Sequence, residues 1–493
     1  MTARQLPERP NLDQLKRQAK ERLRELRAQE PARTFALHDA QFTLAREYGF
    51  SSWNALRDHV EEVTFAFADA VDRFIEAATD GRADRADRLL ARHPAIARAN
   101  VWAALLLGDA ATVDDHIVHH PGFVLERGGP RGWEPLHYVC YSGLGRRSAE
   151  REAGLVTIAR RLISLGADPN LRYPWLHHGV HRPVLWSAVC VAGSLPLAAA
   201  LLEAGANPSD GVTLPIAASG GNTAALDLLL AHGVDVDRPW ATDGSAPVYA
   251  ILQWAKIDRG VRWLLEHGAD PDPVFADNGE TPLHVVAARW DSALADAFVS
   301  RGADVARPRA DGRTPYAIAE LSGNRDVAAW LVAHGAPPTI SEIDRLVAAC
   351  ARGERVTANL RSDLGPEHYN ALFRAIELND VPAVEAMLAC GFDPNWPDES
   401  IGKTALHVAA QEGRPEMVRV LLAHGASVSA RDREFKGQPL IWAAEGSRGS
   451  RADRDYATVG RLLLEAGSPT DWQESEEPSA AIVEIVNEWR GIE

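Results

Sequence analysis

The sequence predicts an all-α solenoid, a curved stack of short helix pairs. Three observations lead to this prediction. Residues 404–427, TALHVAAQEGRPEMVRVLLAHGAS, read as two amphipathic helices joined by a bend, because apolar residues recur at helical spacing. The same opening occurs as TPLH from Thr281 and as TPYA from Thr314, 33 positions later. A closing glycine followed by a small residue recurs at Gly166, Gly205, Gly233, Gly268, Gly302, Gly335, Gly425 and Gly467.

The unit at 404–427 shows how the sequence specifies such a helix pair. Thr404 is expected to cap the first helix, because its hydroxyl can accept from a free backbone N–H in the first turn. Gly413 and Gly425 are expected to end the two helices, since glycine adopts the left-handed conformation most easily. Neither helix can bury its apolar face alone, so the unit requires neighbours of the same kind.

A TPLH phrase that recurs with a period near 33 residues resembles the ankyrin-repeat family. The resemblance covers roughly residues 68–472, as about twelve helix pairs of which some are degenerate. The chain is similar to large bacterial ankyrin-repeat proteins that carry an N-terminal helical segment. The resemblance implies binding of another molecule rather than chemistry. It also implies that His137, His284 and His407 tie neighbouring fingers of the stack together by hydrogen bonds.

The domain boundaries follow from where the repeats begin and start again. Residues 1–63 lack the repeat pattern and are expected to form a three-helix cap. The first array is expected over 68–338 and the second over 339–472, because IDRLVAACARGE from Ile343 echoes VDRFIEAATDGR from Val71. Residues 473–493 are expected to form a capping helix. Across 339–367, where apolar residues are few, the stacking is expected to bend.

Charge and composition restrict the class of partner. A net charge of −16 argues against a nucleic-acid partner, because phosphate binding requires a surplus of Lys and Arg. No apolar run approaches the ~18 residues of a membrane span, and the start has no apolar signal segment, so a cytoplasmic protein is expected. The four cysteines lack C-x-x-C spacing and are expected to be small core residues.

A DNA-linked role through residues 39–60 is the last-ranked alternative. The spacing of Ala45, Gly49 and Ala55 is faintly similar to a helix-turn-helix, which would turn Arg57 and its neighbours towards DNA. Residues 1–63 carry eleven Lys/Arg against ten Asp/Glu, and this near-neutral balance is poor for gripping phosphates.

Signatures of catalysis are absent from the sequence. It has no G-x-S-x-G, P-loop, H-E-x-x-H or dinucleotide fingerprint, and no cofactor or metal is expected. The densest polar patch is residues 173–183, with His177, His178 and His181. Pro174, Gly179 and Pro183 impose a loop there, which favours a recognition loop over a metal site.

Aromatic residues gather between about 130 and 295, at positions where the family resemblance implies recognition. As a group we expect them to be exposed and to line the concave face of the stack as anchors for a partner, and core packing is the alternative for each single residue. Together with the histidines, the candidate binding residues are Trp133, Tyr141, Trp175, His177, His178, His181, Trp186, Trp240, Tyr249, Trp254 and Trp290.

The sequence therefore predicts a cytoplasmic recognition protein whose concave face binds a partner protein or peptide. A small-molecule binder or unusual enzyme is the alternative, with Asp243 or Asp258 as a possible acid or base in a pocket of the repeats 130–295. The insertions at 143–153, 171–183 and 446–457 keep this alternative open, since a plain scaffold does not need them. An open groove would favour a protein partner, and a closed cavity would favour a ligand.

Overall fold

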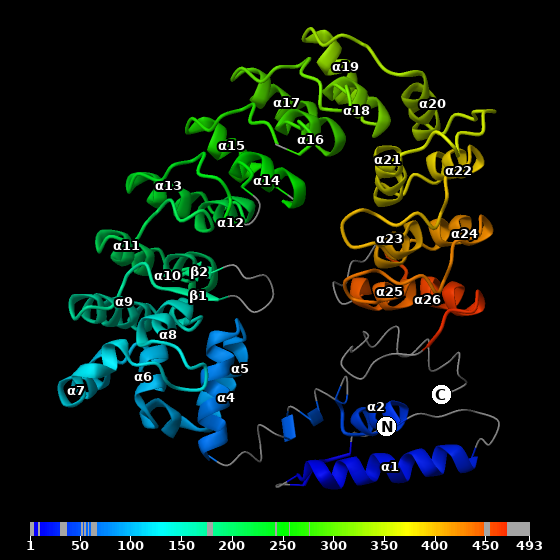
Figure 1. Cartoon of the computed structure of the whole chain (residues 1–493). Coiled ribbons are helices and arrows are strands. Elements are labelled where there is room, and N and C mark those ends of the chain that lie inside the picture. Colours follow the sequence, from blue (N-terminus) through cyan, green and yellow to red (C-terminus); the bar gives the residue numbers. More distant parts are fainter. Residues whose placement is uncertain are drawn as a thin grey trace.

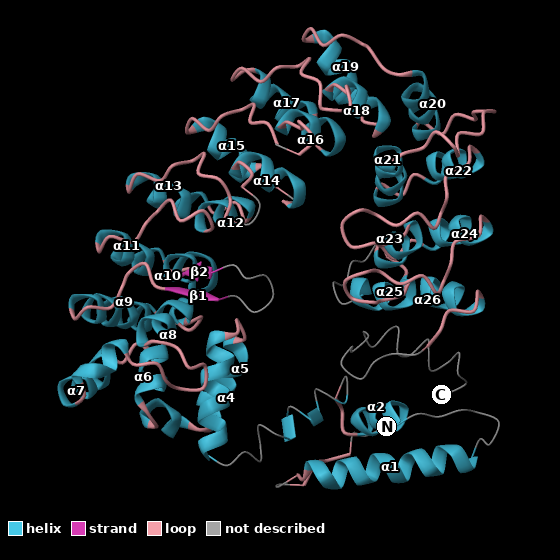
Figure 2. Ribbon diagram, viewed as in Figure 1, coloured by secondary structure: helices cyan, strands magenta, loops and turns pink. Residues whose placement is uncertain are grey.

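The computed structural model shows helix pairs that follow one another along a curved arc (Figure 1). It confirms the all-α solenoid that the sequence predicts. The structure describes residues 4–7, 10–29, 37–50, 53, 56–57, 59–60, 67–174, 181–241, 244–255, 257–275, 277–447 and 454–470. The predicted capping helix at 473–493 lies outside the described residues. Within the described chain, strands occur as one two-stranded sheet (Figure 2).

The N-terminal segment contains helices α1 (Leu12–Gln29) and α2 (Leu37–Glu47). Asn11 caps α1, because its side-chain oxygen accepts from the backbone N–H groups of Asp13 and Gln14. Among the described residues, these helices form a hydrophobic cluster separate from that of the array, built around Leu15, Ala19, Leu44, Ala45, Tyr48, Leu56 and Val60. The segment thus has a small core of its own.

The array begins with helix pairs whose first helices line the inner side of the arc (Figure 1). Their bounds are α4 Phe67–Thr79, α5 Ala83–Arg92, α6 Val101–Leu107, α7 Ala110–His119, α8 Pro135–Tyr141, α9 Ala149–Ser164, α10 Val184–Trp186, α11 Leu195–Glu203, α12 Thr213–Ser219, α13 Thr223–Ala231, α14 Pro247–Trp254, α15 Arg259–Glu266, α16 Pro282–Arg289, α17 Ser292–Val299, α18 Pro315–Leu321 and α19 Arg325–Ala333. Shorter turns are η1 Pro94–Arg98, η2 Pro121–Leu125, η3 Gly145–Arg147 and the π-helical η4 Ser187–Ala192.

The later part of the array starts with a helix that has no second helix of its own. Helix α20 (Glu342–Ala351) packs against α18 on one side and α22 on the other. An irregular segment, 352–365, follows it in place of a partner helix. The remaining helices are α21 Pro366–Glu377, α22 Val381–Ala389, α23 Ala405–Gln411, α24 Pro415–Ala423, α25 Pro439–Ser447 and α26 Tyr456–Glu465.

The unit α23–α24 shows how each pair is held. Thr404 precedes α23, and its backbone N–H donates to Nδ1 of His407 at 3.0 Å. Gly413 and Gly425 have φ of +61° and +84°, so each supplies the left-handed residue that ends its helix, as predicted. Leu406 and Leu421 are fully buried in one core that runs through the whole array. Contacts between neighbouring pairs therefore provide the burial that a single pair lacks.

The joint of the array consists of α20 and the segments that pack on either side of it. Buried charges link these segments. Arg309 is only 6% exposed, and its guanidinium pairs with Glu280 (3.1 Å), Asp311 (2.6 Å) and Glu367 (3.1 Å). These carboxylates come from the preceding finger, from its own finger and from the first turn of α21. A buried cation satisfied by three separate carboxylates fixes these segments relative to one another, because removing it would leave charges unpaired.

A second ion pair holds the first turn of α20. Arg313 donates to both carboxylate oxygens of Asp344, at 2.9 and 2.8 Å, and His368 Nε2 donates to the same carboxylate at 2.9 Å. Burial by itself would raise the pKa of Asp344. The hydrogen bonds from His368 and Arg313 outweigh that effect and lower its pKa to about 2. Asp344 is therefore a carboxylate throughout the neutral range, and the pair stays charged.

Candidate binding face

A short β-hairpin replaces the simple finger after α9. Strands β1 (Arg172–Pro174) and β2 (His181–Pro183) pair antiparallel, with Arg172 opposite Pro183 and Pro174 opposite His181. The sequence predicts a loop over 173–183, and the structure shows strands at both ends of it instead. Prolines at the ends of short edge strands are compatible with this pairing, since they lack only an N–H. Figure 2 shows both strands on the inner side of the arc.

Trp133 is a buried residue, which corrects the prediction that it is an exposed anchor. Its side chain, just before α8, is 6% exposed. Its ring lies 4.9 Å from that of Tyr141 and 5.0 Å from that of Tyr173, measured between centroids. The hairpin places Tyr173 over the indole, and this long-range contact covers the face that the local sequence would leave open.

Tyr141 and Trp186 are also buried rather than exposed. Each is 5% exposed, and their ring centroids are 6.2 Å apart. Burial raises the pKa of the Tyr141 hydroxyl, which stays protonated at neutral pH. The guanidinium of Arg182 lies 4.0 Å above the Trp186 ring, a cation–π contact. The side chains of Tyr141 and Trp186 thus lie beneath the hairpin and support it.

The groups that reach solvent at this place belong to the hairpin. Tyr173 and Arg182 are half-buried, and His181 and Arg172 are exposed. Tyr173 rests on Trp133 and His137, and Arg182 rests on Trp186. The hairpin thus carries a flat ring and a guanidinium that are partly exposed, each resting on a buried aromatic residue.

His137 lacks the hydrogen bond that its counterparts make. In two other repeats, Nε2 of His284 lies 3.1 Å from the carbonyl oxygen of Arg313, and Nε2 of His407 lies 3.1 Å from that of Gly437. These two bonds confirm that the histidines tie each finger to the next. His137 is 3% exposed, and its Nε2 has no hydrogen-bond partner among the residues that the structure describes. For His137 the prediction is wrong, because the aromatic ring of Tyr173 lies against the imidazole.

The indole Nε1 of Trp133 is in the same situation as His137. It is buried and unbonded within the described part of the chain. Burial, with a smaller contribution from Arg127, lowers the pKa of His137 to about 4, so its imidazole is neutral at pH 7. One unmet N–H and one unmet ring nitrogen thus lie beneath the hairpin, whereas most buried polar groups in native proteins are hydrogen-bonded.

The other predicted aromatic residues form a second group around α14 and α16. Tyr249 is 7% exposed, stacks on Phe275 at 5.1 Å and donates its hydroxyl to Glu280 at 2.7 Å. Trp290 is half-buried, and its Nε1 donates to the carbonyl of Leu252 at 3.3 Å. Trp240 is half-buried on the finger before α14. Among the described residues, no ring contact joins this group to the aromatic residues around Trp133.

Several predicted residues cannot be placed. Trp175, His177, His178 and Asp243 lie outside the described residues, as does the side chain of Trp254. The described residues contain no group of three His, Cys, Asp or Glu side chains arranged to hold a metal ion. Asp258 forms an ion pair with Arg262 at 2.5 Å, which occupies the carboxylate proposed as an acid or base.

The aromatic residues around Trp133 form one cluster with rings of the preceding repeat, and the sequence did not predict that second part. Tyr138 donates its hydroxyl to the carbonyl of Gly128 at 2.8 Å, and its ring lies 5.0 Å from that of Trp102. Trp102 also contacts Phe123 at 5.2 Å. Trp102 belongs to a degenerate repeat without the TPLH phrase, so no motif marked its position. The cluster thus spans three successive repeats.

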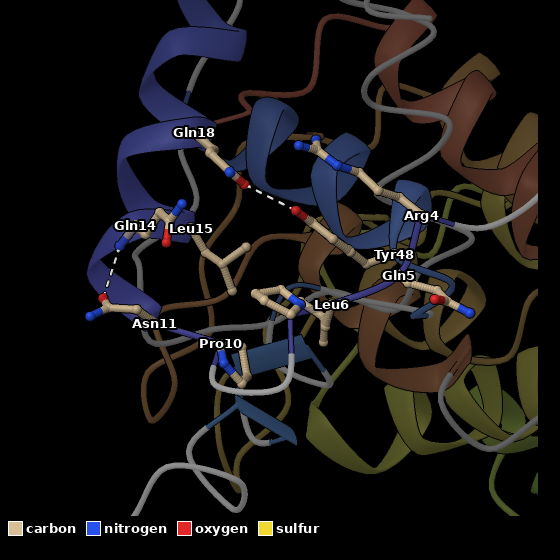
Figure 3. Close-up of a pocket in the computed structure, with 10 residues that line it drawn as sticks. Arg4, Gln5, Leu6, Pro10, Asn11, Gln14, Leu15, Gln18 and Tyr48 are labelled. Carbon is tan, nitrogen blue, oxygen red and sulfur yellow. Dashed lines mark hydrogen bonds between the residues drawn. The ribbon is translucent and has the colours of Figure 1, made fainter.

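A separate hollow of about 260 Å³ lies in the N-terminal segment (Figure 3). Arg4, Pro10, Gln14, Gln18 and Tyr48 are among its lining residues, and Tyr48 donates its hydroxyl to Gln18 at 3.2 Å. None of the predicted binding residues lines it. The hollow is therefore separate from the β-hairpin and from the aromatic residues that contact it.

Comparison with known families identifies the repeat. Residues 248–342, 346–432 and 372–470 match the family described as ankyrin repeats (3 copies). Residues 248–342 and 346–470 are therefore ankyrin repeats. Ankyrin repeats serve generally as protein–protein interaction modules, so the chain belongs to a class that binds protein partners. The matched residues include the units with complete histidine bonds and exclude the hairpin repeat.

Curated relatives match this chain over short stretches. Ankyrin repeat and SOCS box protein 6 of Homo sapiens is 40% identical over 76 residues, which is 15% of this chain and 18% of that protein. Glycerophosphocholine phosphodiesterase gde1 of Schizosaccharomyces pombe is 46% identical over 61 residues, 12% of this chain and 5% of that one. The 2-5A-dependent ribonuclease of Mus musculus is 37% identical over 67 residues, 14% and 9%. The chain spans less than a fifth of each of these relatives.

Among solved structures, the human ASB11 ankyrin repeat domain covers 53% of this chain and 100% of its own length, with 22% identity and a TM-score of 0.24. Among the helices of the described residues, none is long and apolar enough to cross a membrane.

Proposed function

We propose that this ankyrin array is a cytoplasmic recognition protein that binds a protein or peptide on the inner side of its first part, at the hairpin face. The face comprises Tyr173, His181 and Arg182 on the hairpin, supported by Trp133, Tyr141 and Trp186. The other predicted aromatics with described side chains, Trp240, Tyr249 and Trp290, are proposed as a second contact area around α14 and α16. Free thiols at all four cysteines suit a reducing compartment.

One observation carries this proposal. The histidine that ties one finger to the next is bonded in the units of His284 and His407 and unbonded in the unit of His137. Native proteins depart from such local rules mainly at functional sites. Here the departure coincides with an insertion that puts a tyrosine and an arginine on the surface where ankyrin arrays bind.

The chemistry of the face suits a peptide better than an ion. Aromatic rings and arginine are the side chains most enriched at the energetic centres of protein interfaces. Tyr173 and Arg182 are each held in place by an aromatic contact, so ordering them on binding costs little side-chain entropy. Trp133 Nε1–H can in addition donate to a backbone carbonyl if the hairpin shifts on binding.

Hydrogen–deuterium exchange with a captured partner tests the proposal. A partner captured from the native host by the immobilised chain should slow exchange in residues 133–141 and 181–192. The fingers at 277–281 and 431–438, which are tied by complete histidine bonds, serve as the internal control and should change little. Protection confined to the later repeats around Trp396 and Trp442 would place the site there and contradict the proposal.

A further inference from the structure

Two cysteines from different helices lie in contact at the joint. Cys350 is in the last turn of α20, and Cys390 directly follows α22. Their Sγ atoms are 3.1 Å apart, and both side chains are fully buried. A disulfide bond is about 2.05 Å long. The sulfur atoms are thus about 1 Å too far apart to be bonded, a gap that small side-chain rotations can close.

The pair lies where the stack lacks a helix. Sγ of Cys390 also approaches the carbonyl oxygen of Val356 at 3.4 Å, in the irregular segment that follows α20. At the other end of α20, Asp344 is held by Arg313 and His368. Helix α20 is therefore fixed by charges at its first turn, whereas near its last turn the Cys390 thiol contacts both the Cys350 thiol and the Val356 carbonyl.

We propose that Cys350 and Cys390 form an oxidative modification site, a dithiol that a peroxide converts to a disulfide joining α20 to α22. One thiol, as its thiolate, attacks a peroxide oxygen, and the O–O bond breaks to give a sulfenic acid and water. The second thiol then attacks the sulfenyl sulfur, and a second water leaves. The two sulfurs lose two electrons, and hydrogen peroxide is reduced to two waters.

Burial determines how this site would behave. Burial raises the pKa of Cys350 to about 12, with a further contribution from Cys390, so the thiolate is scarce while the joint is closed. Oxidation therefore requires a local opening of the α20–α22 contact and is slow. Once formed, the bond restrains a stretch in which the two cysteines are 40 positions apart, which restricts the unfolded chain.

Thiol counting on the full chain tests the site. The untreated protein, unfolded in guanidinium, should take up four N-ethylmaleimide groups, one for each cysteine. After exposure to hydrogen peroxide in the native state it should take up two and be about 2 Da lighter, with a Cys350–Cys390 linked peptide on digestion. The melting temperature should rise by about 5 °C and return after reduction.

Matched variants separate this site from general oxidation. Cys140→Ser/Cys190→Ser should still form the bond, whereas Cys350→Ser should show no rise in melting temperature. Retention of four reactive thiols after peroxide, a bridge between other cysteines, or sulfinic acid without a bridge would overturn the proposal. The outcome is independent of the hairpin face, since both cysteines lie outside it.

Discussion

The repeats of His407 and His137 carry a histidine at the same position, but among the described residues only His407 bonds to the next finger. In the first, the imidazole accepts from Thr404 and its Nε2 lies 3.1 Å from the Gly437 carbonyl of the next finger. In the second, Glu134 stands in the place of threonine, and Nε2 has no partner among the described residues. Both imidazoles are buried to a similar degree. The difference lies in the finger that follows, which is a simple turn in one case and a hairpin in the other.

This comparison shows how an ankyrin scaffold accommodates an inserted hairpin. The hydrophobic core continues unbroken through both units. What changes is the polar tie between fingers, which the hairpin replaces by the aromatic contacts of Tyr173 with Trp133 and His137. Directional hydrogen bonds are thus exchanged for non-directional packing at this finger.

The largest expected difference is in stability. His407→Leu should lower the free energy of unfolding by about 3 kcal/mol, because it leaves the Thr404 N–H buried without a partner and removes one of the two hydrogen bonds to the Gly437 carbonyl. His137→Leu should change it by less than about 1 kcal/mol, because it removes a ring nitrogen, Nε2, that has no hydrogen-bond partner among the described residues. Urea unfolding of the two variants beside the parent chain measures both values. Equal losses would show that His137 is tied like the others.

The next difference concerns pH. The pKa of His137 in the fold is about 4, below the ~6.5 of an unfolded chain, so the unfolded state binds the proton more readily. The stability that this burial provides is complete above about pH 6.5 and is lost as the pH falls towards 4. Between pH 7 and pH 5 the parent chain should lose about 2 kcal/mol relative to His137→Leu.

The parallel change at His284 is the control for this measurement. Burial likewise lowers the pKa of His284 to about 4. His284→Leu should remove the same acid dependence, but it should also destabilise the protein at pH 7, where His137→Leu does not. An identical pH profile for the parent chain and His137→Leu would show that the His137 imidazole is accessible to protons in the fold.

The sequence predicts the scaffold well because the information is local. The TPLH phrase and the closing glycines each act within one helix pair, and Gly425 and Thr404 take the conformations that their residue types favour. The same local reasoning puts Trp133 and Tyr141 on the surface, and that part of the prediction is wrong. Their burial depends on Tyr173, which reaches them from the next repeat through strand pairing that no repeat motif encodes.

The joint lay beyond sequence reasoning for a similar reason. Few apolar residues in 339–367 indicate a break in the stack, but they do not indicate what replaces it. Arg309 is paired with carboxylates 29 and 58 positions away, at Glu280 and Glu367, and such pairs have no periodic signature. Contacts at these separations are determined by how successive fingers stack, which only the folded chain shows.

The most direct test of the account is the affinity of a captured partner for a Tyr173→Ala variant, measured by isothermal titration calorimetry. Loss of the half-buried ring that rests on Trp133 should weaken binding at least tenfold, about 1.4 kcal/mol. Tyr316→Ala, which removes a half-buried tyrosine from α18 in a regular repeat, is the matched control and should bind like the parent chain. Equal affinity of all three proteins would contradict the assignment of binding to the hairpin face.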